Sequence, residues 1–334
     1  MDATTMNTRQ RAAFRRPRPA VASLATLALI AALASGEAAA QAPNPGDGAC
    51  PVPPETPALL NAKPLGKKNG ERDEEGRAFN REMMGGMVAF IKSLERMSDA
   101  AINGDAAAGT CFGTNLDRWV RNNPATLPQS GQANFEQTWT LSAVALAVVK
   151  AQAAGVKITP EVKNWLRTMS DGVRAFHTAK PFTNNHAAWA AVAVGAAAYI
   201  TGDQDAWRWA LGRESIVTDQ IQDDGTLPRE LQRGKSATSY HLFTAMPLAA
   251  LNLMQRCRGG VEASQGAGMK RLVALLPQLE QNPQFLAARA GAEQGVPKHY
   301  PVVRILRGES QETFFEQKLG GETANLPKAL ARCK

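Results

Sequence analysis

The sequence predicts an all-α fold of antiparallel helical hairpins wound into a barrel or a solenoid. Three observations support this prediction. Apolar residues recur at three- and four-residue spacing through most of the chain, with Gly, Pro, Asn or Asp in the gaps. Strand signals are few. The segment Trp189 to Tyr199 is nearly all apolar and small, so it should be a helix buried on most of its surface, in an inner layer.

The N-terminal segment has the order of a secretory signal peptide. Basic residues between Arg9 and Arg18 precede an apolar run from Ala20 to Ala34, and the small-residue site Ala38-Ala39-Ala40 follows. The apolar run is shorter than the ~20 residues that span a bilayer, and no later segment is long and apolar enough. We therefore expect residues 1–40 to be removed by cleavage after Ala40 or Ala42. The mature protein should be periplasmic or secreted, without a membrane anchor.

Residues 41–334 should form a single domain, because about 290 residues can bury one large core and no low-complexity linker divides them. Residues 41–76 are rich in Pro, Gly, Lys and Glu without sustained periodicity, which indicates an irregular arm. No strict repeat occurs, and no helix shows a sustained external heptad seam, so we expect a monomer. Helices are predicted at Arg81–Asn103, Glu136–Ala154, Pro160–Phe176, Asn185–Thr201, Asp205–Ile221, Ala237–Cys257 and Ala263–Leu279.

The four cysteines, Cys50, Cys111, Cys257 and Cys333, are widely spaced and lack the intervals of a metal site. An even number of cysteines in an exported chain predicts two disulfides. Three pairings are open. We favour Cys50 with Cys111 and Cys257 with Cys333, because each bond would tie an irregular end to the body.

The chain carries a formal net charge of +8, and loss of residues 1–40, which hold five Arg and two acids, leaves a modest basic excess. A basic surface suits a polyanionic partner. Export and the lack of basic residues interleaved with aromatic ones argue against nucleic acid. The charge alone does not identify the partner, because basic surfaces attract nucleic acid, membranes and acidic glycans alike.

Three short motifs carry groups suited to acid–base chemistry on a sugar acid. The stretch Thr183 to His186 supplies an amide and an imidazole, and the stretch Asp224 to Arg233 supplies a guanidinium. The stretch Ser239 to His241 supplies a phenol. These groups can neutralise a sugar carboxylate, remove the adjacent proton and return a proton to the leaving oxygen. Together they indicate a lyase that cuts an acidic polysaccharide.

Local geometry supports a shared site. Thr183 or Asn184 is a good N-cap for the buried helix, and backbone N–H groups at a helix N-terminus favour a bound carboxylate. Arg233 and Tyr240 are seven residues apart and would share a face of a continuous helix, although Gly234 could interrupt it. Taken singly, each motif is more typical of a helix cap, a core histidine or a surface arginine.

The order and spacing of these motifs resemble the alginate lyases of polysaccharide lyase family five, which cleave poly-β-mannuronate. The matching patterns are Asn-Asn-His-x-x-Trp at Asn184 to Trp189, Asp-x-Gly-x-Leu-Pro-x-Glu-Leu-x-Arg at Asp223 to Arg233, and Tyr-His at Tyr240. The resemblance implies an incomplete α/α toroid, or α/α barrel, with a deep substrate cleft. It requires no metal or other cofactor.

The same resemblance implies a set of functional residues. The catalytic groups fall on Asn185, His186, Arg233 and Tyr240. Members of the family also carry a mobile lid with a tyrosine near the N-terminus, whereas the corresponding arm here has lysines and no tyrosine. Additional substrate contacts are expected from Asn184, Trp189, Lys63, His241 and Tyr300.

The implied reaction is β-elimination across C4 and C5 of a uronate. Asn185, with His186 and Arg233, would stabilise the enolate-like intermediate at the sugar carboxylate. In mannuronate the C5 proton and the C4 oxygen lie on the same side of the ring, so Tyr240 could serve as both base and acid. A free tyrosine titrates near ~10, so a phenolic base needs a cation beside it, and Arg233 is the candidate. His186 is the alternative base.

Other functions remain open at this stage. Glucuronate shares the C4/C5 arrangement of mannuronate, so a lyase of broader specificity or a polyglucuronate lyase fits the same residues. A glycoside hydrolase on a similar helical fold would need two carboxylates, such as Glu230 with Asp223 or Asp224. A non-catalytic polyuronate-binding protein is the third alternative.

Overall fold

The structure is a computed structural model that describes residues 50, 52, 67–68, 71–122, 131–258, 266–296, 302–306, 321, 323, 325–331 and 333. Three predictions lie outside these residues: the signal peptide at residues 1–40, and the substrate contacts of Lys63 and Tyr300. Most of the expected arm at residues 41–76 lies outside them as well. Within the described ranges, no helix combines the length and the apolar character needed to cross a membrane.

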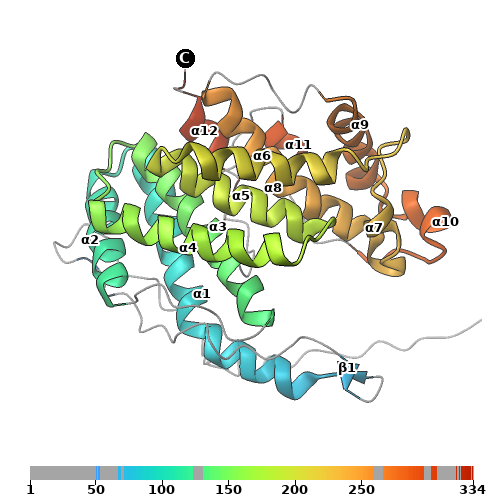
Figure 1. Ribbon diagram of the computed structural model, residues 1–334, viewed down its shortest axis with the longest axis horizontal. Coiled ribbons are helices and arrows are strands. Elements are labelled where there is room, and N and C mark those ends of the chain that lie inside the picture. The colour runs from blue at the N-terminus through green and yellow to red at the C-terminus, as the bar shows by residue number, and fades with distance from the viewer. Residues whose placement is uncertain are drawn as a thin grey trace, which may run out of the picture. The chain divides into compact units, whose positions relative to one another are not determined.

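The described part of the chain is almost entirely helical (Figure 1). A short antiparallel ladder precedes the first helix, with Lys67 opposite Arg72. In chain order the elements are β1 (Lys67–Lys68), β2 (Glu71–Arg72), α1 (Glu74–Ile102), α2 (Ala106–Asn122), α3 (Gly131–Ala153), α4 (Pro160–Ala179), α5 (Asn185–Thr201), α6 (Gln204–Thr218), α7 (Pro228–Leu231), η3 (Gly234–Ser236), α8 (Ala237–Cys257), α9 (Ala267–Gln281), η5 (Pro283–Leu286), α10 (Ala287–Ala290), α11 (Val302–Leu306) and α12 (Leu326–Leu330).

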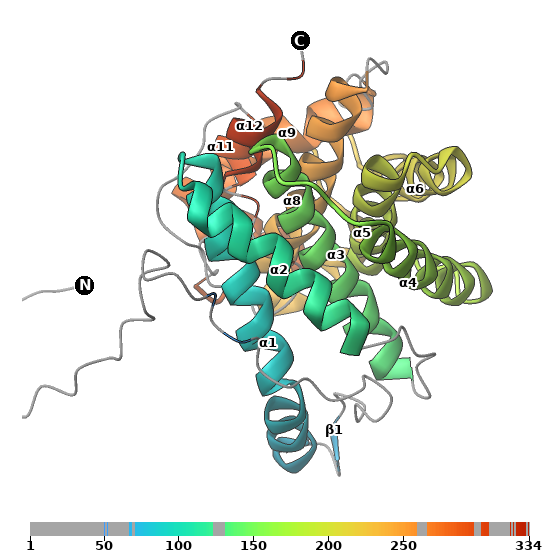
Figure 2. The ribbon, with the colours of Figure 1, turned by 90° about the vertical axis from the view of Figure 1, so that its left-hand side faces the viewer.

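Helices α3, α5 and α8 form an inner layer, as Figure 2 shows, with α3 and α8 between the α1–α2 pair and the α4–α6 pair. Helix α5 packs against α3, α4, α6 and α8 and is buried on nearly all sides. Close packing depends on its small residues. A Cβ on Gly195 would lie 2.5 Å from Leu251 Cδ1, so even Ala there would force the Leu251 side chain of α8 to move. The predicted all-α fold with a buried inner helix is confirmed.

The helix boundaries follow local capping signals. Helix α5 begins after its N-cap Asn184 and ends before Gly202, which adopts φ +75°. The predicted limits of α5 and α8 agree with the structure. Helix α1 begins at Glu74 instead of Arg81, because the Asp73 side chain accepts a hydrogen bond of 2.9 Å from Gly76 N. The last residues of the expected arm are therefore helical.

Helix α2 is absent from the sequence prediction. Its sequence contains Gly109 and Gly113, and glycine in a helix interior lowers helix propensity. The structure gives Gly109 a packing reason, because a Cβ there would lie 3.2 Å from a Val156 methyl group. A Cβ on Gly113 would lie 3.5 Å from the other methyl group, an ordinary contact. Helix α2 exists because it packs against α1 and α4, not because of its own propensity.

Two disulfides join distant parts of the chain. Cys50 pairs with Cys111 and Cys257 pairs with Cys333, with Cα–Cα distances of 5.1 and 4.9 Å. The favoured pairing is confirmed. A buried ion pair adds a further link, since Lys150 Nζ of α3 lies 2.6 Å from Asp99 Oδ1 of α1. This contact fixes the axial register of the two helices.

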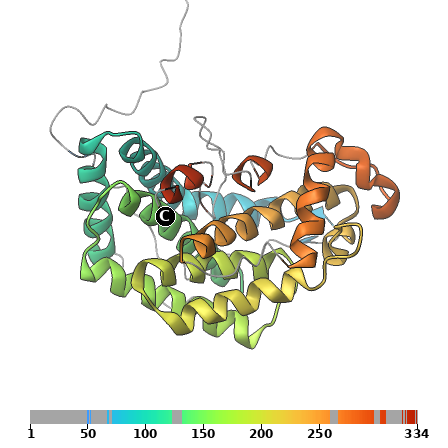
Figure 3. The same cartoon turned by 90° about the horizontal axis from the view of Figure 1, so that it is seen from above.

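Helix α9, η5 and α10 gather around the beginning of α8, as Figure 3 shows from above. Arg271 of α9 donates hydrogen bonds of 2.6 and 2.8 Å to the carbonyl oxygens of Ile221 and Gln222. Arg289 of α10 forms an ion pair with Asp224. These contacts hold the turn between α6 and α7, which carries the second sequence motif.

Candidate active site

The first turn of α5 is occupied by the protein's own groups. Asn184 Oδ1 accepts a hydrogen bond of 3.2 Å from His186 N, and the Asn184 carbonyl accepts one of 2.9 Å from Ala187 N. Asn185 N donates to Glu230 Oε1 at 2.8 Å. A carboxylate does lie at this helix N-terminus, as its dipole favours, but it belongs to Glu230. The expectation that these backbone groups bind the substrate carboxylate is therefore wrong.

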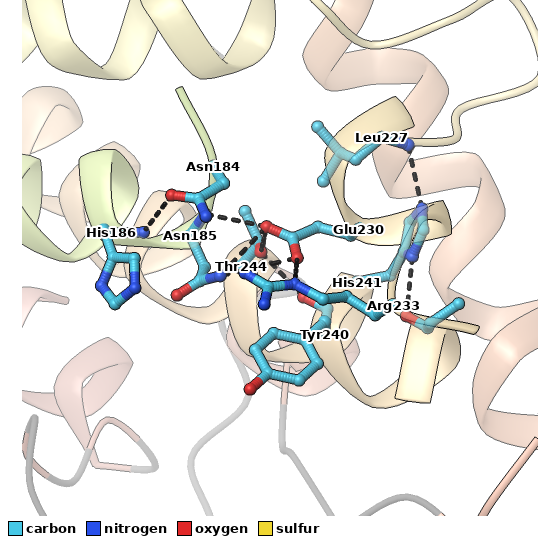
Figure 4. A network of polar contacts seen from close by, with 10 residues as sticks. Asn184, Asn185, His186, Leu227, Glu230, Arg233, Tyr240, His241 and Thr244 are labelled. Atoms are coloured by element: carbon cyan, nitrogen blue, oxygen red, sulfur yellow. Dashed lines mark hydrogen bonds and ion pairs between the residues drawn. The ribbon is translucent and has the colours of Figure 1, made fainter. Parts of the chain in front are cut away.

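Glu230 lies at the centre of the polar network in Figure 4. Its side chain is 1% exposed and also accepts a hydrogen bond of 3.2 Å from Asn185 Nδ2. Arg233 Nε lies 3.4 Å from Oε2, and Thr244 Oγ1 lies 3.3 Å from Oε1. From the sequence, Glu230 was expected only as an acid of the hydrolase alternative. Glu230 lies inside the second motif, between Pro228 and Arg233, and this position was the one sequence feature that could have pointed to a role in the site.

A tight turn at Gly225 directs the chain into α7, which carries Glu230. Gly225 adopts φ +84°, and a Cβ there would lie 2.4 Å from the carbonyl oxygen of Arg271. Only glycine fits both the backbone conformation and the close approach. Asp224 Oδ1 accepts a hydrogen bond of 3.1 Å from Thr226 N, which closes the turn. Pro228 then begins α7, as proline favours the first helical position.

Arg233 and Tyr240 meet across a bend in the chain. Gly234 has φ +55° and starts the short helix η3, so the two residues are not on one continuous helix. The guanidinium carbon of Arg233 nevertheless lies 4.6 Å from the centre of the Tyr240 ring. The expected juxtaposition is confirmed, through a turn and a cation–π contact rather than a shared helical face.

His186 lies against an aromatic wall from α3. Its ring stacks on Phe135 with centroids 4.1 Å apart and an interplanar angle of 27°. Phe182 lies 5.4 Å away on the loop before α5. Burial, helped by the positive charge of Arg233, lowers the pKa of His186 to about 4. The imidazole is therefore neutral at pH 7 and can donate or accept a hydrogen bond, but it adds no positive charge.

Phe135 is a residue that the sequence analysis missed. We expect Phe135→Ala to raise the pKa of His186 from about 4 towards ~6.5, because water replaces the stacked ring and the protonated imidazole regains its hydration. An NMR titration of the His186 ring protons measures the change. Phe176→Ala is the matched control, since Phe176 contacts Phe135 at 5.4 Å within the same cluster. An unchanged midpoint in Phe135→Ala would contradict the assigned cause.

His241 does not reach the substrate side of the site. It is fully buried, its Nε2 accepts a hydrogen bond of 2.9 Å from Leu227 N, and its Nδ1 donates one of 2.8 Å to the Ala237 carbonyl. Burial lowers the pKa of His241, so the neutral ring keeps this arrangement. The prediction that His241 contacts substrate is wrong. Its ring fastens the start of α7 to the first turn of α8.

Trp189 is likewise a core residue. Its side chain has no exposed surface, and its ring packs against Phe243 of α8 with centroids 5.1 Å apart. The prediction that Trp189 contacts substrate is therefore wrong. Its place in the Asn-Asn-His-x-x-Trp motif puts it one turn after His186, on the face of α5 that packs against α8.

The carboxylate pair needed by a glycoside hydrolase is not assembled. Asp223 points into solvent with a fully exposed side chain, and Asp224 is held by Arg289 and the Thr226 turn. Glu230 is buried among hydrogen-bond donors. The structure therefore contradicts the hydrolase alternative. Across the described ranges, no group of three or more His, Cys, Asp and Glu side chains is placed to hold a metal ion.

Comparisons with known proteins identify the class. A protein of Stenotrophomonas maltophilia (strain K279a) described as a polysaccharide lyase is 29% identical over 259 residues, which cover 74% of this chain and 77% of that protein. With the site above, this similarity defines the chain as a polysaccharide lyase. The alginate lyase family profile matches residues 33–286, more than half of the chain. The chain belongs to the alginate lyase family.

Other relatives match over shorter regions. An alginate lyase of Pseudomonas syringae pv. syringae is 29% identical over 136 residues, covering 40% of this chain and 36% of that enzyme. One from Pseudomonas putida (strain W619) is 32% identical over 112 residues, covering 33% of this chain and 30% of that enzyme. The chain thus matches about a third of the length of these pseudomonad enzymes.

Solved structures support the fold. Alginate lyase A1-III from Sphingomonas species A1 superposes with a TM-score of 0.60 at 20% identity, covering 86% of this chain and 88% of that chain. A tyrosine-to-phenylalanine variant of alginate lyase A1-III complexed with a tetrasaccharide gives a TM-score of 0.61 at 18% identity, covering 86% and 87%. The predicted α/α toroid is confirmed.

Proposed function

We propose that the protein is an exported lyase that cleaves poly-β-D-mannuronate, the mannuronate form of alginate, by metal-independent β-elimination. The observation that carries the proposal is a set of contacts centred on Arg233. Arg233 and Asn185 share the buried Glu230 carboxylate, and the guanidinium lies over the Tyr240 ring and acts electrostatically on His186. The alginate lyases among its relatives support the choice of polymer.

Recognition of the sugar carboxylate falls mainly on side chains, because the backbone groups at the N-terminus of α5 are already satisfied. Arg233 supplies the permanent positive charge, and its side chain is 35% exposed. An N–H of the neutral His186 ring is a further donor. Asn185 is 1% exposed, so its second amide proton serves as a donor only if the side chains that cover it move when the polymer binds. Hydrogen bonds to the carboxylate strengthen as negative charge moves onto it during proton removal, which is the source of catalysis.

Tyr240 carries the proton. In its phenolate form it removes the C5 proton, the electrons of the C–H bond form the C4–C5 double bond, and the C4–O bond breaks. Tyr240 then returns the proton to the glycosidic oxygen that leaves. The products are an unsaturated uronate on one fragment and a hydroxyl group on the other. Because the reaction needs a phenolate, activity should rise towards alkaline pH.

The test is an ultraviolet assay for unsaturated uronate with polymannuronate, polyguluronate and polyglucuronate, in the presence of a chelator. We expect absorbance to rise with polymannuronate and to be insensitive to the chelator. A rise mainly with polyglucuronate would keep the mechanism and overturn the proposed specificity. Binding without any rise would overturn the lyase mechanism and favour a polyuronate-binding protein.

Export is the second part of the proposal and rests on the signal-peptide pattern of residues 1–40. Expression in a Gram-negative host followed by fractionation should place the protein in the periplasm or the medium. N-terminal sequencing should then begin at Gln41 or Pro43. A full-length protein retained in the cytoplasm would contradict this part without affecting the proposed chemistry.

A further inference from the structure

We propose that Glu230 is a positioning residue of this site: its buried carboxylate holds Asn185 and Arg233 in the orientation that receives the sugar carboxylate, and it offsets the guanidinium charge beside Tyr240. The inference rests on the proposed function. It adds a residue that touches neither the sugar nor the transferred proton.

The contacts with Asn185 fix both its backbone and its side chain. Glu230 Oε1 accepts hydrogen bonds from Asn185 N at 2.8 Å and from Asn185 Nδ2 at 3.2 Å. The amide nitrogen also lies 3.5 Å from Oε2, so rotation of the Asn185 side chain would break its hydrogen bonds to the buried carboxylate. These bonds hold the amide group in a fixed direction. Glu230 therefore orients a donor that would otherwise sample several rotamers.

The contact with Arg233 is similar in effect. Nε lies 3.4 Å from Glu230 Oε2, so the inner nitrogen of the guanidinium faces the protein and the two terminal nitrogens are left for the substrate. The exposures agree with this division, because Arg233 is 35% exposed and Glu230 is 1% exposed. The same contact keeps the guanidinium 4.6 Å from the centre of the Tyr240 ring.

The charge balance at the site follows from the groups that face Glu230 and Tyr240. Arg233, from the turn after α7, contacts both of them. Glu230 acts electrostatically on His241 of α8, and Arg233 acts on His186 of α5. Burial lowers the pKa of both histidines, so neither is charged at neutral pH. Glu230 and Arg233 thus form a compensated pair, and loss of the carboxylate leaves one uncompensated positive charge next to the phenol.

The experiment is Glu230→Gln, assayed for unsaturated uronate over a range of pH and for binding of a mannuronate tetramer by calorimetry. We expect kcat to fall about 10²-fold, because the donors lose their fixed geometry. Binding should be unchanged or tighter, because the guanidinium is no longer offset. The rise of kcat/KM with pH should move to lower pH, since the uncompensated cation favours the phenolate. A residue that only maintains the fold would not produce this combination.

Glu214→Gln is the matched control. Glu214 is also a buried carboxylate that accepts a side-chain amide, at 2.6 Å from Gln255 Nε2, but it lies on α6 towards the other end of α8. It should retain wild-type kinetics. Wild-type kcat and pH dependence in Glu230→Gln would overturn the inference while leaving the proposed function intact.

If circular dichroism shows that Glu230→Gln does not fold, a second variant, Glu230→Asp, tests the inference instead. Glu230→Asp keeps the charge and shortens the side chain, so kcat should fall while the pH dependence stays in place. Wild-type kcat in this variant would also overturn the inference. An inactive wild-type protein would overturn the proposed function instead. Weaker binding of the tetramer by Glu230→Gln than by the wild type would overturn the expected charge effect.

Discussion

Replacement of Tyr240 by Phe is expected to lower kcat about 10²- to 10⁴-fold, the usual contribution of a positioned acid or base. The variant keeps the ring that packs against Phe243 and under Arg233, with Tyr240 and Phe243 centroids 6.1 Å apart. Among the residues drawn in Figure 4, none forms a hydrogen bond to the phenol oxygen, so its removal leaves none of them unpaired. The fold and the affinity for polymer should therefore persist.

The measurement combines steady-state kinetics with calorimetry on the same polymer. Ser239→Ala, next to Tyr240 in the chain, is a control in which no acid or base is removed. A loss of kcat with unchanged affinity supports Tyr240 as the proton carrier. Retention of more than about a tenth of kcat would instead assign the role to His186, the alternative base, despite its low pKa.

Replacement of Trp189 by Ala is expected to destabilise the fold by about 3–5 kcal/mol, the range for deletion of a fully buried aromatic side chain. Trp189 has no exposed surface and lies on α5, the helix that contacts both other inner helices. The cavity would open between α5 and Phe243 of α8. The free energy of unfolding in urea measures the loss.

Trp189→Phe is the control, because it preserves most of the packing. The Nε1 of Trp189 is buried without a hydrogen-bond partner among the described residues, so its loss in the Phe variant removes no hydrogen bond. The Phe variant should therefore lose much less stability than the Ala variant. Trp189→Ala could instead keep its stability and lose affinity for polymer. That result would make Trp189 a substrate contact, as the motif alone suggested.

Two of the three inner helices, α5 and α8, were predicted with the bounds that the structure shows, because the residues that mark their ends are recognisable locally. Asn184 caps α5 and Gly202 ends it, and both can be recognised in the sequence. Helix α2 could not be predicted, because Gly109 and Gly113 argue locally against a helix that packing against Val156 favours. Tertiary contacts overrode propensity there.

The reacting groups of the candidate site could be predicted from the sequence. The residues that hold those groups in place could not. Asn185, His186, Arg233 and Tyr240 could be selected because the motifs resemble a known family. Glu230 and Phe135 could not be assigned, because nothing local indicates that one lies under Asn185 and the other against His186. His241 and Trp189 share those motifs and serve the core.

By itself, the sequence determined the helical class, the number of disulfides and the chemical groups of the site, because periodicity, capping and side-chain chemistry can be recognised in short segments. Only the tertiary structure decided which carboxylate lies at the N-terminus of α5 and which motif residues are buried. The Glu230 contact joins residues 45 positions apart, and burial depends on which neighbours cover a side chain. Both are set when the helices pack, which no short segment encodes.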